Sequence, residues 1–267
     1  MAEKNRGQPV PAEIYGREYF MHVCDGFEEF AETRAGTLPE RLGKCLALAR
    51  IGQGNAVLDL GCGRGEITIN AARQGAMAFG TDYSADGLEI ANSAAGGLAG
   101  KKVLFVRADA KKLPYKSGAF GTVFFIDTVE HLHPWEAEET MREISRVMKK
   151  GGTLVMETSP NALLAKPLYA VAGIVGLGRG PINQVVHVNE QSWFSLRALL
   201  KRHGFTAKVW LEMDTRWFRA AVGNKRASGA FGVLLRIVEN RAVSKVLGTM
   251  PLALFFSPRL WATGVKG

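Results

Sequence analysis

Two aspartates and a glycine-rich loop within a short segment have the types and spacing needed to hold a nucleotide-containing cofactor. Asp59 lies in an apolar segment that leads into the loop GCGRG at 61–65, and Asp82 ends the next apolar segment. Glycines allow a sharp turn and a close approach to a ligand because they have no Cβ. The helix expected after the loop presents free N–H groups and the positive end of its dipole, and Asp82 is placed to accept both hydroxyls of a ribose.

Glu66 separates the two classes of cofactor that use such a loop. A dinucleotide-binding loop has the pattern G-x-G-x-x-G, and Glu66 replaces its third glycine with an acid that would repel the phosphates. NAD and FAD are therefore disfavoured. The run instead resembles motif I of class I S-adenosylmethionine-dependent methyltransferases, acid-x-G-x-G-x-G, through Asp59, Gly61, Gly63 and Gly65. This resemblance implies S-adenosyl-L-methionine as cofactor and S-adenosyl-L-homocysteine as product, with the loop against the methionine portion, Asp59 near its amino group and Asp82 on the ribose.

The resemblance covers residues 55–158 closely and extends to 190–211. Residues 103–110, VLFVRADA, resemble the third strand and the following Asp that contacts the adenine amino group in this family, here Asp109. The approach to the fourth strand, 113–127, also matches, although Gly121 replaces a usual Asp. Tyr15 and Tyr19 resemble an N-terminal segment that closes over the cofactor, and they could equally be core aromatics. The predicted cofactor-binding residues are Asp59, Gly61, Cys62, Gly63, Asp82, Tyr83, Asp109, Ala110, Asp127 and Tyr19.

His187 and His131 are the predicted catalytic residues for the chemistry that the resemblance implies. In methyl transfer the cofactor supplies the electrophile and the leaving group, so the protein mainly positions and deprotonates the acceptor. Histidine is the natural base near neutral pH. His187 precedes the helix expected from residue 190, where small-molecule members of this family often place a histidine that faces the acceptor. The alternative is a loop histidine that bonds a carbonyl.

His131 has two alternative interpretations besides catalysis. It follows the expected fourth strand and could bond the backbone at a helix start. The run Asp127-x-x-Glu130-His131 also resembles the E-x-x-E-H of ubiquinone-pathway O-methyltransferases, whose acids and histidine hold a divalent metal. Oxygen ligands would suit magnesium. Because Asp replaces the first Glu and the E-H pair is common across the wider family, we predict no metal site.

Short apolar segments alternate with helical patterns along most of the chain, which predicts an α/β fold with helices on both faces of the sheet. The resemblance makes this a doubly wound, seven-stranded, mostly parallel sheet of the Rossmann-like methyltransferase type, with an antiparallel last strand. We expect strands near 55–60, 76–81, 103–107, 121–126, 152–157, 205–211 and 260–265. We expect helices near 65–74, 84–95, 136–149 and 190–203, after an N-terminal helical region over about 16–50.

The domain prediction is an N-terminal helical cap, 1–54, and a methyltransferase domain, 55–267. Three prolines and four glycines within 159–189 predict an irregular insertion. A second insertion, 213–257, contains a helical apolar spacing over 231–247. We expect the two insertions to form a substrate lid, with packing on the core or contact with a membrane as alternatives for the second.

Composition fits a soluble globular enzyme, with 267 residues, 47% of them hydrophobic and 22% charged. The N-terminus lacks the apolar core of a secretory signal, and the longest apolar run, 168–177, is too short to span a bilayer. The cysteines Cys24, Cys45 and Cys62 have no metal-binding or disulfide-framework spacing. We therefore expect a cytoplasmic protein.

Charge is distributed unevenly along the chain. Residues 179–267 hold 14 Lys and Arg against 4 Asp and Glu, a net of +10, whereas residues 1–178 have a net of −1. This predicts an anionic partner for the last third, and an ordinary solvated face is the alternative. Apolar residues such as 252–256 beside the basic ones suggest a peripheral contact with the inner face of an anionic membrane.

The sequence thus predicts S-adenosylmethionine-dependent methyl transfer to a small-molecule or lipid-linked acceptor, most simply at oxygen. A nucleic-acid methyltransferase would use the basic third, but residues 127–130, DTVE, differ from the D/N-P-P-Y/F/W motif that amino-directed enzymes of that kind often carry. A non-catalytic cofactor-binding partner subunit is a further alternative. The sequence leaves the oligomeric state open.

Overall fold

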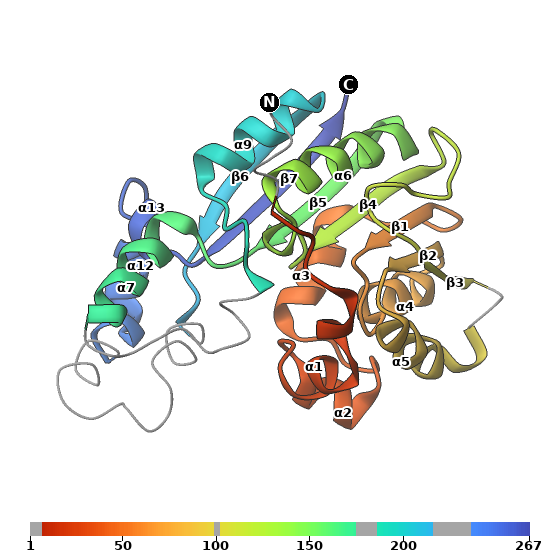
Figure 1. The fold of residues 1–267 in the computed structure, drawn as a ribbon, viewed down its shortest axis with the longest axis horizontal. Coiled ribbons are helices and arrows are strands. Elements are labelled where there is room, and N and C mark those ends of the chain that lie inside the picture. The colour runs from red at the N-terminus through yellow and green to blue at the C-terminus, as the bar shows by residue number, and fades with distance from the viewer. Residues whose placement is uncertain (1–6, 99–101, 175–185, 216–235) are drawn as a thin grey trace.

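Seven strands form one sheet in the order β3-β2-β1-β4-β5-β7-β6 (Figure 1), and β7 runs antiparallel to both of its neighbours. The computed structural model describes residues 7–98, 102–174, 186–215 and 236–267. The predicted α/β fold with a doubly wound, mostly parallel sheet is confirmed. The strands are β1 (Ala56–Leu60), β2 (Met77–Asp82), β3 (Val103–Arg107), β4 (Phe120–Ile126), β5 (Met148–Thr158), β6 (Phe205–Glu212) and β7 (Arg259–Lys266).

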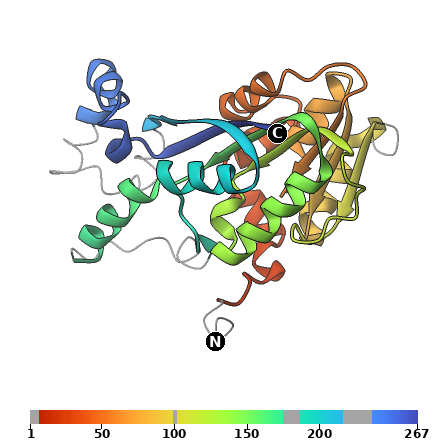
Figure 2. The ribbon, with the colours of Figure 1, turned by 90° about the horizontal axis from the view of Figure 1, so that it is seen from above.

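Helices cover both faces of the sheet (Figure 2). The α-helices are α1 (Arg17–His22), α2 (Phe27–Thr33), α3 (Glu40–Ala49), α4 (Glu66–Arg73), α5 (Ala85–Ala95), α6 (Pro134–Val147), α7 (Ala162–Ile174), α9 (Trp193–Arg202), α12 (Arg241–Leu247) and α13 (Ala253–Phe256). Short 3₁₀ turns are η2 (Ala12–Tyr15), η3 (Gly96–Leu98) and η4 (Val129–His131). The N-terminal helical region and the βα repeat lie where the sequence predicted them.

The alternation of side chains along the buried strands divides the core into two clusters. Val57 of β1 packs in the cluster that includes residues of α3, α4 and α5. Its neighbour Leu58 packs in the other cluster, with residues of α6 and α9. Both side chains are fully buried, as expected for parallel strands covered on both faces. The two clusters hold the strands rigid, so the loops at their carboxyl ends form a firm support for a site.

Three expectations about helices were wrong. The helix expected over 136–149 ends at Val147, because Met148 already pairs with Phe120 as the first residue of β5. The insertion at 159–189, expected to be irregular, contains α7 because its alanines and leucines favour a helix, and the exposed Pro167 removes only one backbone donor. The helical spacing over 231–247 is broken at Asn240, whose side chain caps α12; residues 231–235 lie outside the described residues.

α7, α12 and α13 lie together at the end of the molecule opposite β3 (Figures 1 and 2). We call the described residues 162–174 and 236–256 the distal lobe. The lobe follows the carboxyl ends of β5 and β6 and precedes β7. In the described parts of the chain, no helix combines the length and apolar character needed to cross a membrane.

Candidate active site

A cavity of about 340 Å³ lies at the carboxyl ends of the parallel strands, beneath the N-terminal helices. Its walls come from the loop after β1, the ends of β2 and β4, the loop after β3, and the cap segment 9–42. This is the position in which open α/β sheets bind ligands. It also brings together all ten predicted cofactor residues and one of the two predicted bases, which line it: Asp59, Gly61, Cys62, Gly63, Asp82, Tyr83, Asp109, Ala110, Asp127, Tyr19 and His131.

Among the predicted site residues, His187 alone is not in the described cavity wall, and its ring lies 5.0 Å from that of His131. The predicted cofactor residues therefore share one cavity, and the predicted bases are a lining residue and its neighbour.

The glycine loop adopts backbone angles that require glycine. Gly61, Gly63 and Gly65 have φ angles of +74°, +48° and +77°, in the left-handed region that other residues rarely adopt. A Cβ on Gly61 would collide with the side chain of Thr128. The loop consequently turns sharply between β1 and α4 and presents backbone to the cavity, as the sequence predicted.

Asp59 is a buried acid at the floor of the cavity, with 4% of its surface exposed. Its Oδ2 accepts hydrogen bonds from the Thr68 hydroxyl at 2.7 Å and the Thr68 backbone N–H at 3.2 Å. Burial raises the pKa of Asp59 to about 7, although these hydrogen bonds act in the opposite direction. A cationic amino group in the cavity would favour its ionised form.

Asp82 is fixed by the backbone at the end of β2. Its Oδ2 accepts from the Gly63 N–H and its Oδ1 from the Ser84 N–H, both at 2.9 Å. These bonds join the glycine loop to the second strand and orient the carboxylate before a ligand arrives. Each carboxylate oxygen has a further lone pair, so Asp82 fits the predicted role of accepting ribose hydroxyls.

Asp109 lies at the rim of the cavity and is held by Lys111. Lys111 Nζ lies 3.0 Å from Asp109 Oδ2 and 2.7 Å from Glu136 Oε1. The Lys111 backbone N–H also bonds Asp109 Oδ1 at 2.8 Å. Asp109 therefore has a defined orientation beside Ala110, at the place expected for the adenine.

Arg64, the variable residue inside the glycine loop, joins that loop to the cap. Its side chain is 1% exposed and donates to the carbonyl oxygens of Phe20 at 2.6 Å and Asp25 at 2.8 Å. Its Nε also donates to Glu66 at 3.0 Å. Glu66, which argued against a dinucleotide, thus pairs with the arginine that fastens the cap. The sequence analysis missed this role, and a charged residue between two motif glycines was the signal.

Aromatic residues of the cap lie over the cavity. Tyr15 packs against Tyr19 and Tyr83, with ring centroids 5.0 Å and 5.5 Å apart. The Tyr15 hydroxyl lies 3.0 Å from His131 Nδ1, and the Tyr15 ring is 6% exposed. Tyr15 and Tyr19 therefore pack as core aromatics and also line the cavity, and their contact with a cofactor stays a prediction.

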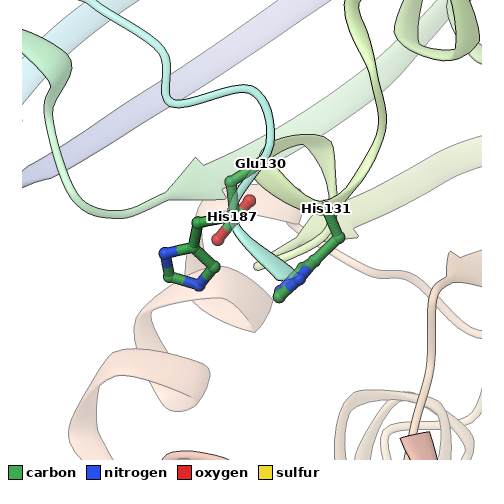
Figure 3. Close-up of side chains that lie close together, drawn as sticks. All are labelled: Glu130, His131 and His187. Atoms are coloured by element: carbon green, nitrogen blue, oxygen red, sulfur yellow. The ribbon is translucent and has the colours of Figure 1, made fainter. Parts of the chain in front are cut away.

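Glu130, His131 and His187 lie close together (Figure 3), and the carboxylate of Glu130 lies between the two imidazoles in that view. The rings of His131 and His187 are 5.0 Å apart. Glu130 is 1% exposed and accepts a hydrogen bond from the Thr158 hydroxyl at 2.8 Å. Burial and the neighbouring Asp127 raise the pKa of Glu130 well above its usual range.

His131 is held in a neutral form. Burial and the nearby His187 lower the pKa of His131 to about 3. Its Nδ1 lies 3.0 Å from the Tyr15 hydroxyl and 3.2 Å from the Val186 carbonyl oxygen; the tautomer with its proton on Nδ1 donates to that carbonyl and leaves the lone pair on Nε2. The alternative that His131 bonds the backbone at a helix start holds only in part, since His131 contacts the Val186 carbonyl whereas His133 occupies the N-cap of α6.

One ligand atom from each of Glu130, His131 and His187 lies within 4.8 Å of the others, a spacing at which the three side chains could share a divalent cation. Two imidazoles and a carboxylate are a common donor set for such ions. The prediction of no metal site stays a prediction. His187 also departs from the E-x-x-E-H resemblance, because it comes from a different segment of the chain.

A buried ion-pair network adjoins the histidines. Arg41 NH1 lies 2.5 Å from Asp127 and 2.7 Å from Glu157, and Arg259 NH1 lies 3.0 Å from the other oxygen of Glu157. Arg259 Nε continues the network to Asp214 at 2.6 Å. Although burial raises the pKa of Asp127, Arg41 and Arg259 outweigh it and lower that pKa. Asp127 thus binds arginine in the cavity wall, a contact that its predicted role as a cofactor residue did not anticipate.

Comparison with known proteins agrees with this geometry. Residues 57–152 match the family model described as a methyltransferase domain. The chain is 33% identical over 135 residues to the methyltransferase GfsG of Streptomyces halstedii, covering 49% of this chain and 45% of that protein. It is 33% identical over 146 residues to the 27-O-demethylrifamycin SV methyltransferase of Amycolatopsis mediterranei, covering 54% and 52%. The chain thus spans about half the length of the curated relatives it matches.

A solved structure extends the similarity to most of the fold. The phosphoethanolamine N-methyltransferase 2 of Haemonchus contortus, solved with phosphomonomethylethanolamine and S-adenosylhomocysteine, superposes with a TM-score of 0.62 at 17% identity. The match covers 95% of this chain and 60% of that one. At this identity it supports the fold alone. The glycine loop, the sheet and the matched family model together indicate that residues 57–152 are a methyltransferase domain, similar to the domains of class I S-adenosylmethionine-dependent methyltransferases.

Proposed function

We propose that this protein transfers a methyl group from S-adenosylmethionine to a hydroxyl group of a small-molecule or lipid-linked acceptor. The observation that carries the proposal is the division of one cavity between two sets of residues. The glycine loop, Asp82 and Asp109 follow β1, β2 and β3, whereas His131 follows β4. A cofactor held over the first three strands would direct its methyl group toward the histidine side.

S-adenosylmethionine, when bound, supplies an activated methyl group together with its own leaving group. The chain's residues would hold it through the acids described above. Asp82 would accept the ribose hydroxyls, Asp59 would pair with the amino group, and Asp109 would contact the adenine. Tyr15 and Tyr19 would exclude water from above. Orientation of two bound partners accounts for a large share of the rate in such reactions.

His131 would receive the acceptor proton. Its Nε2 lone pair is available because Nδ1 bonds Val186, and its low pKa keeps that lone pair unprotonated at neutral pH. Asp127, whose charge acts to raise the pKa of His131, would stabilise the charge that develops on the ring, and His187 and Glu130 adjoin the ring. We therefore propose His131 as the catalytic base and His187 as a positioning residue, although the sequence analysis predicted a catalytic role for both.

Transfer to nitrogen is the main rival. The rifamycin relative is named for an oxygen and the Haemonchus enzyme for a nitrogen, so the names of relatives do not decide between them. A histidine base favours oxygen, because a hydroxyl must lose its proton as it is methylated. A neutral amine can attack the methyl group first and lose its proton afterwards. Nucleic acid is less favoured as the acceptor because the cavity lies beneath the cap.

We propose that residues 1–54 act as the cap of the methyltransferase domain. Cap residues from Pro9 to Leu42 line the cavity, which supports this role. Val186–Asn189 at the end of the first insertion also adjoins the site, because the backbone N–H groups of Val188 and Asn189 bond the Glu130 carbonyl oxygen. The described residues of the second insertion do not line the cavity. A lid role for that insertion therefore depends on residues outside those described. We also propose a cytoplasmic location, either free or at the periphery of the membrane.

Calorimetry with S-adenosylmethionine, S-adenosylhomocysteine and NADH tests the cofactor. We expect both adenosyl compounds to bind and NADH not to bind; tight binding of NADH alone would overturn the proposal. Mass spectrometry of metabolites incubated with the protein and labelled S-adenosylmethionine then identifies the acceptor. A product labelled on oxygen supports methyl transfer to a hydroxyl group. A product labelled only on nitrogen contradicts transfer to oxygen but still shows methyltransferase activity. Binding of the cofactor without any transfer would favour a partner subunit.

A further inference from the structure

Large apolar side chains are unusually exposed on the distal lobe. Of the twelve large apolar residues exposed in the described parts of the chain, six lie within 237–256. They are Ile237 (49% exposed), Val246 (57%), Met250 (57%), Leu252 (38%), Phe255 (53%) and Phe256 (39%). Single exposed apolar residues need no explanation, but a concentration of them marks an interaction surface.

The helices that carry these residues bury little of themselves. Among the described residues of α12, none is buried, and α13 buries only Ala253. α13 packs against α7, at the end of the molecule opposite β3 (Figures 1 and 2). An amphipathic helix in a monomer normally buries its apolar stripe against the core, so α12 and α13 present theirs outward.

Basic side chains accompany the apolar ones. Arg236, Arg241 and Lys245 are exposed in this segment, against one acid, Glu239. We call these three cations and the six exposed apolar residues the lobe patch. The combination of exposed aromatic and aliphatic side chains with lysine and arginine is typical of helices that lie in the interface of an anionic bilayer.

We propose that the lobe patch binds the surface of an anionic lipid bilayer. Anionic headgroups would neutralise the three cations while the apolar side chains enter the boundary with the acyl chains. A second copy of the chain fits the patch less well, because a two-fold contact places the same patch on both subunits and brings like charges together. The helices are too short to span the bilayer, so the contact is at its surface.

The lobe and the cavity share one edge of the sheet. The lobe follows the carboxyl ends of β5 and β6, and the cavity lies at the carboxyl ends of the other parallel strands. A lobe resting on a bilayer would therefore bring the cavity edge close to the lipid. If the proposed function is correct, this arrangement favours an acceptor that is itself dissolved in, or attached to, lipid.

Co-sedimentation with vesicles tests the surface without requiring any methyl transfer. We expect the full chain to bind phosphatidylcholine vesicles that contain phosphatidylglycerol, to bind pure phosphatidylcholine weakly, and to dissociate as salt rises, because charges are screened over about 8 Å at physiological ionic strength. Phe255→Ser combined with Phe256→Ser should reduce partitioning roughly tenfold or more. Phe194→Ser is the matched control, since Phe194 is 57% exposed and belongs to α9, which is not part of the lobe.

A charge-reversal pair completes the test. Arg241→Glu with Lys245→Glu should abolish binding to the anionic vesicles, whereas Lys149→Glu with Lys150→Glu, an exposed pair at the start of β5, should leave it unchanged. Equal binding by the lobe variants and their controls would overturn the proposal, as would a lack of vesicle binding by the unaltered chain. A dimer in light scattering that dissociates in the Phe255 and Phe256 variant would assign the patch to a second copy instead. Calorimetry of S-adenosylmethionine on the same samples reports the proposed function separately.

Discussion

The two sides of the cavity are built differently. On the cofactor side, Asp59 and Asp82 are oriented mainly by nearby backbone and by one threonine, all within residues 59–84. On the acceptor side, His131 contacts Tyr15 and His187, while Arg41 joins Asp127 to Glu157. One side depends on local backbone geometry, and the other on contacts between distant parts of the chain.

This difference separates binding from chemistry. In the proposed function the cofactor side binds one fixed molecule, S-adenosylmethionine, so a short motif with fixed backbone geometry suffices. The acceptor side must fit a molecule that varies among relatives, and its residues come from several segments that can change independently. Substitutions on the acceptor side should therefore alter turnover or stability, and substitutions on the cofactor side should alter cofactor affinity.

The largest expected effect is on turnover. His131→Ala should reduce kcat by about 10²- to 10⁴-fold if His131 is the base, with S-adenosylmethionine affinity nearly unchanged. His22→Ala is the control, because His22 is an exposed histidine on α1. Steady-state kinetics and calorimetry on the same samples check both values. If His131→Ala lowered cofactor affinity as strongly as kcat, the separation of cofactor binding from catalysis between the two sides of the cavity would be contradicted. Activity that persists in EDTA would also remove a metal at Glu130, His131 and His187.

The next effect is on stability. Arg41→Met would leave Asp127 and Glu157 without their shared cation, and removing one partner of a buried pair typically lowers the free energy of unfolding by about 3–5 kcal/mol. The matched control is Arg17→Met, whose pair with Glu89 is exposed on both sides and should contribute little. Urea unfolding measures both. Equal losses in the two variants would contradict a structural role for the buried network.

A smaller effect concerns affinity. Asp82→Ala removes a charged acceptor for two ribose hydroxyls, and each such bond contributes about 1.5–3 kcal/mol. We expect a loss of at least about tenfold in affinity for both S-adenosylmethionine and S-adenosylhomocysteine, measured by calorimetry. Turnover at saturating cofactor should stay near the unaltered value. An unchanged affinity would show that Asp82 only supports the loop.

The smallest effect is a pH dependence of cofactor binding. The pKa of Asp59 is about 7 in the free protein, and a cationic amino group favours its ionised form, so affinity should rise as pH rises through that value. One unit below the pKa, roughly a tenth of the carboxylate is ionised, which predicts about a tenfold weaker affinity near pH 6 than near pH 8. Asp59→Asn should bind more weakly at high pH and show no such rise. A rise that persists in this variant would assign it to another group.

The sequence predicted the sheet well, and it selected ten cofactor candidates that line one cavity, because both patterns are local. Asp59, Gly61, Gly63 and Asp82 lie in one continuous run, and glycine with φ near +74° is recognisable from sequence alone. The acceptor side was less predictable. Arg41 and Glu157 are 116 residues apart, yet they bond at 2.7 Å, and nothing in the sequence near either residue indicates its partner.

Helical segments outside the repeat were predicted least well. Proline and glycine content suggested an irregular 159–189, but the alanine and leucine content of α7 outweighed Pro167. Periodicity alone also extended one helix through Asn240, where a side-chain cap begins another. Pro167 was interpreted as ending a helix, but it lies inside one. Asn240 was interpreted as part of a continuous helix, but it caps the start of α12.

The ion pair between Asp214 and Arg259 has an evolutionary consequence. Asp214 precedes the segment that contains α12 and α13, and Arg259 follows it. Their buried contact at 2.6 Å joins the two ends of this segment, and Arg259 also pairs with Glu157 of β5. A segment closed in this way can be lengthened, shortened or exchanged while the strands on either side keep their register. Replacement of this one segment during evolution would therefore change the surface to which the protein binds while the cavity stays the same.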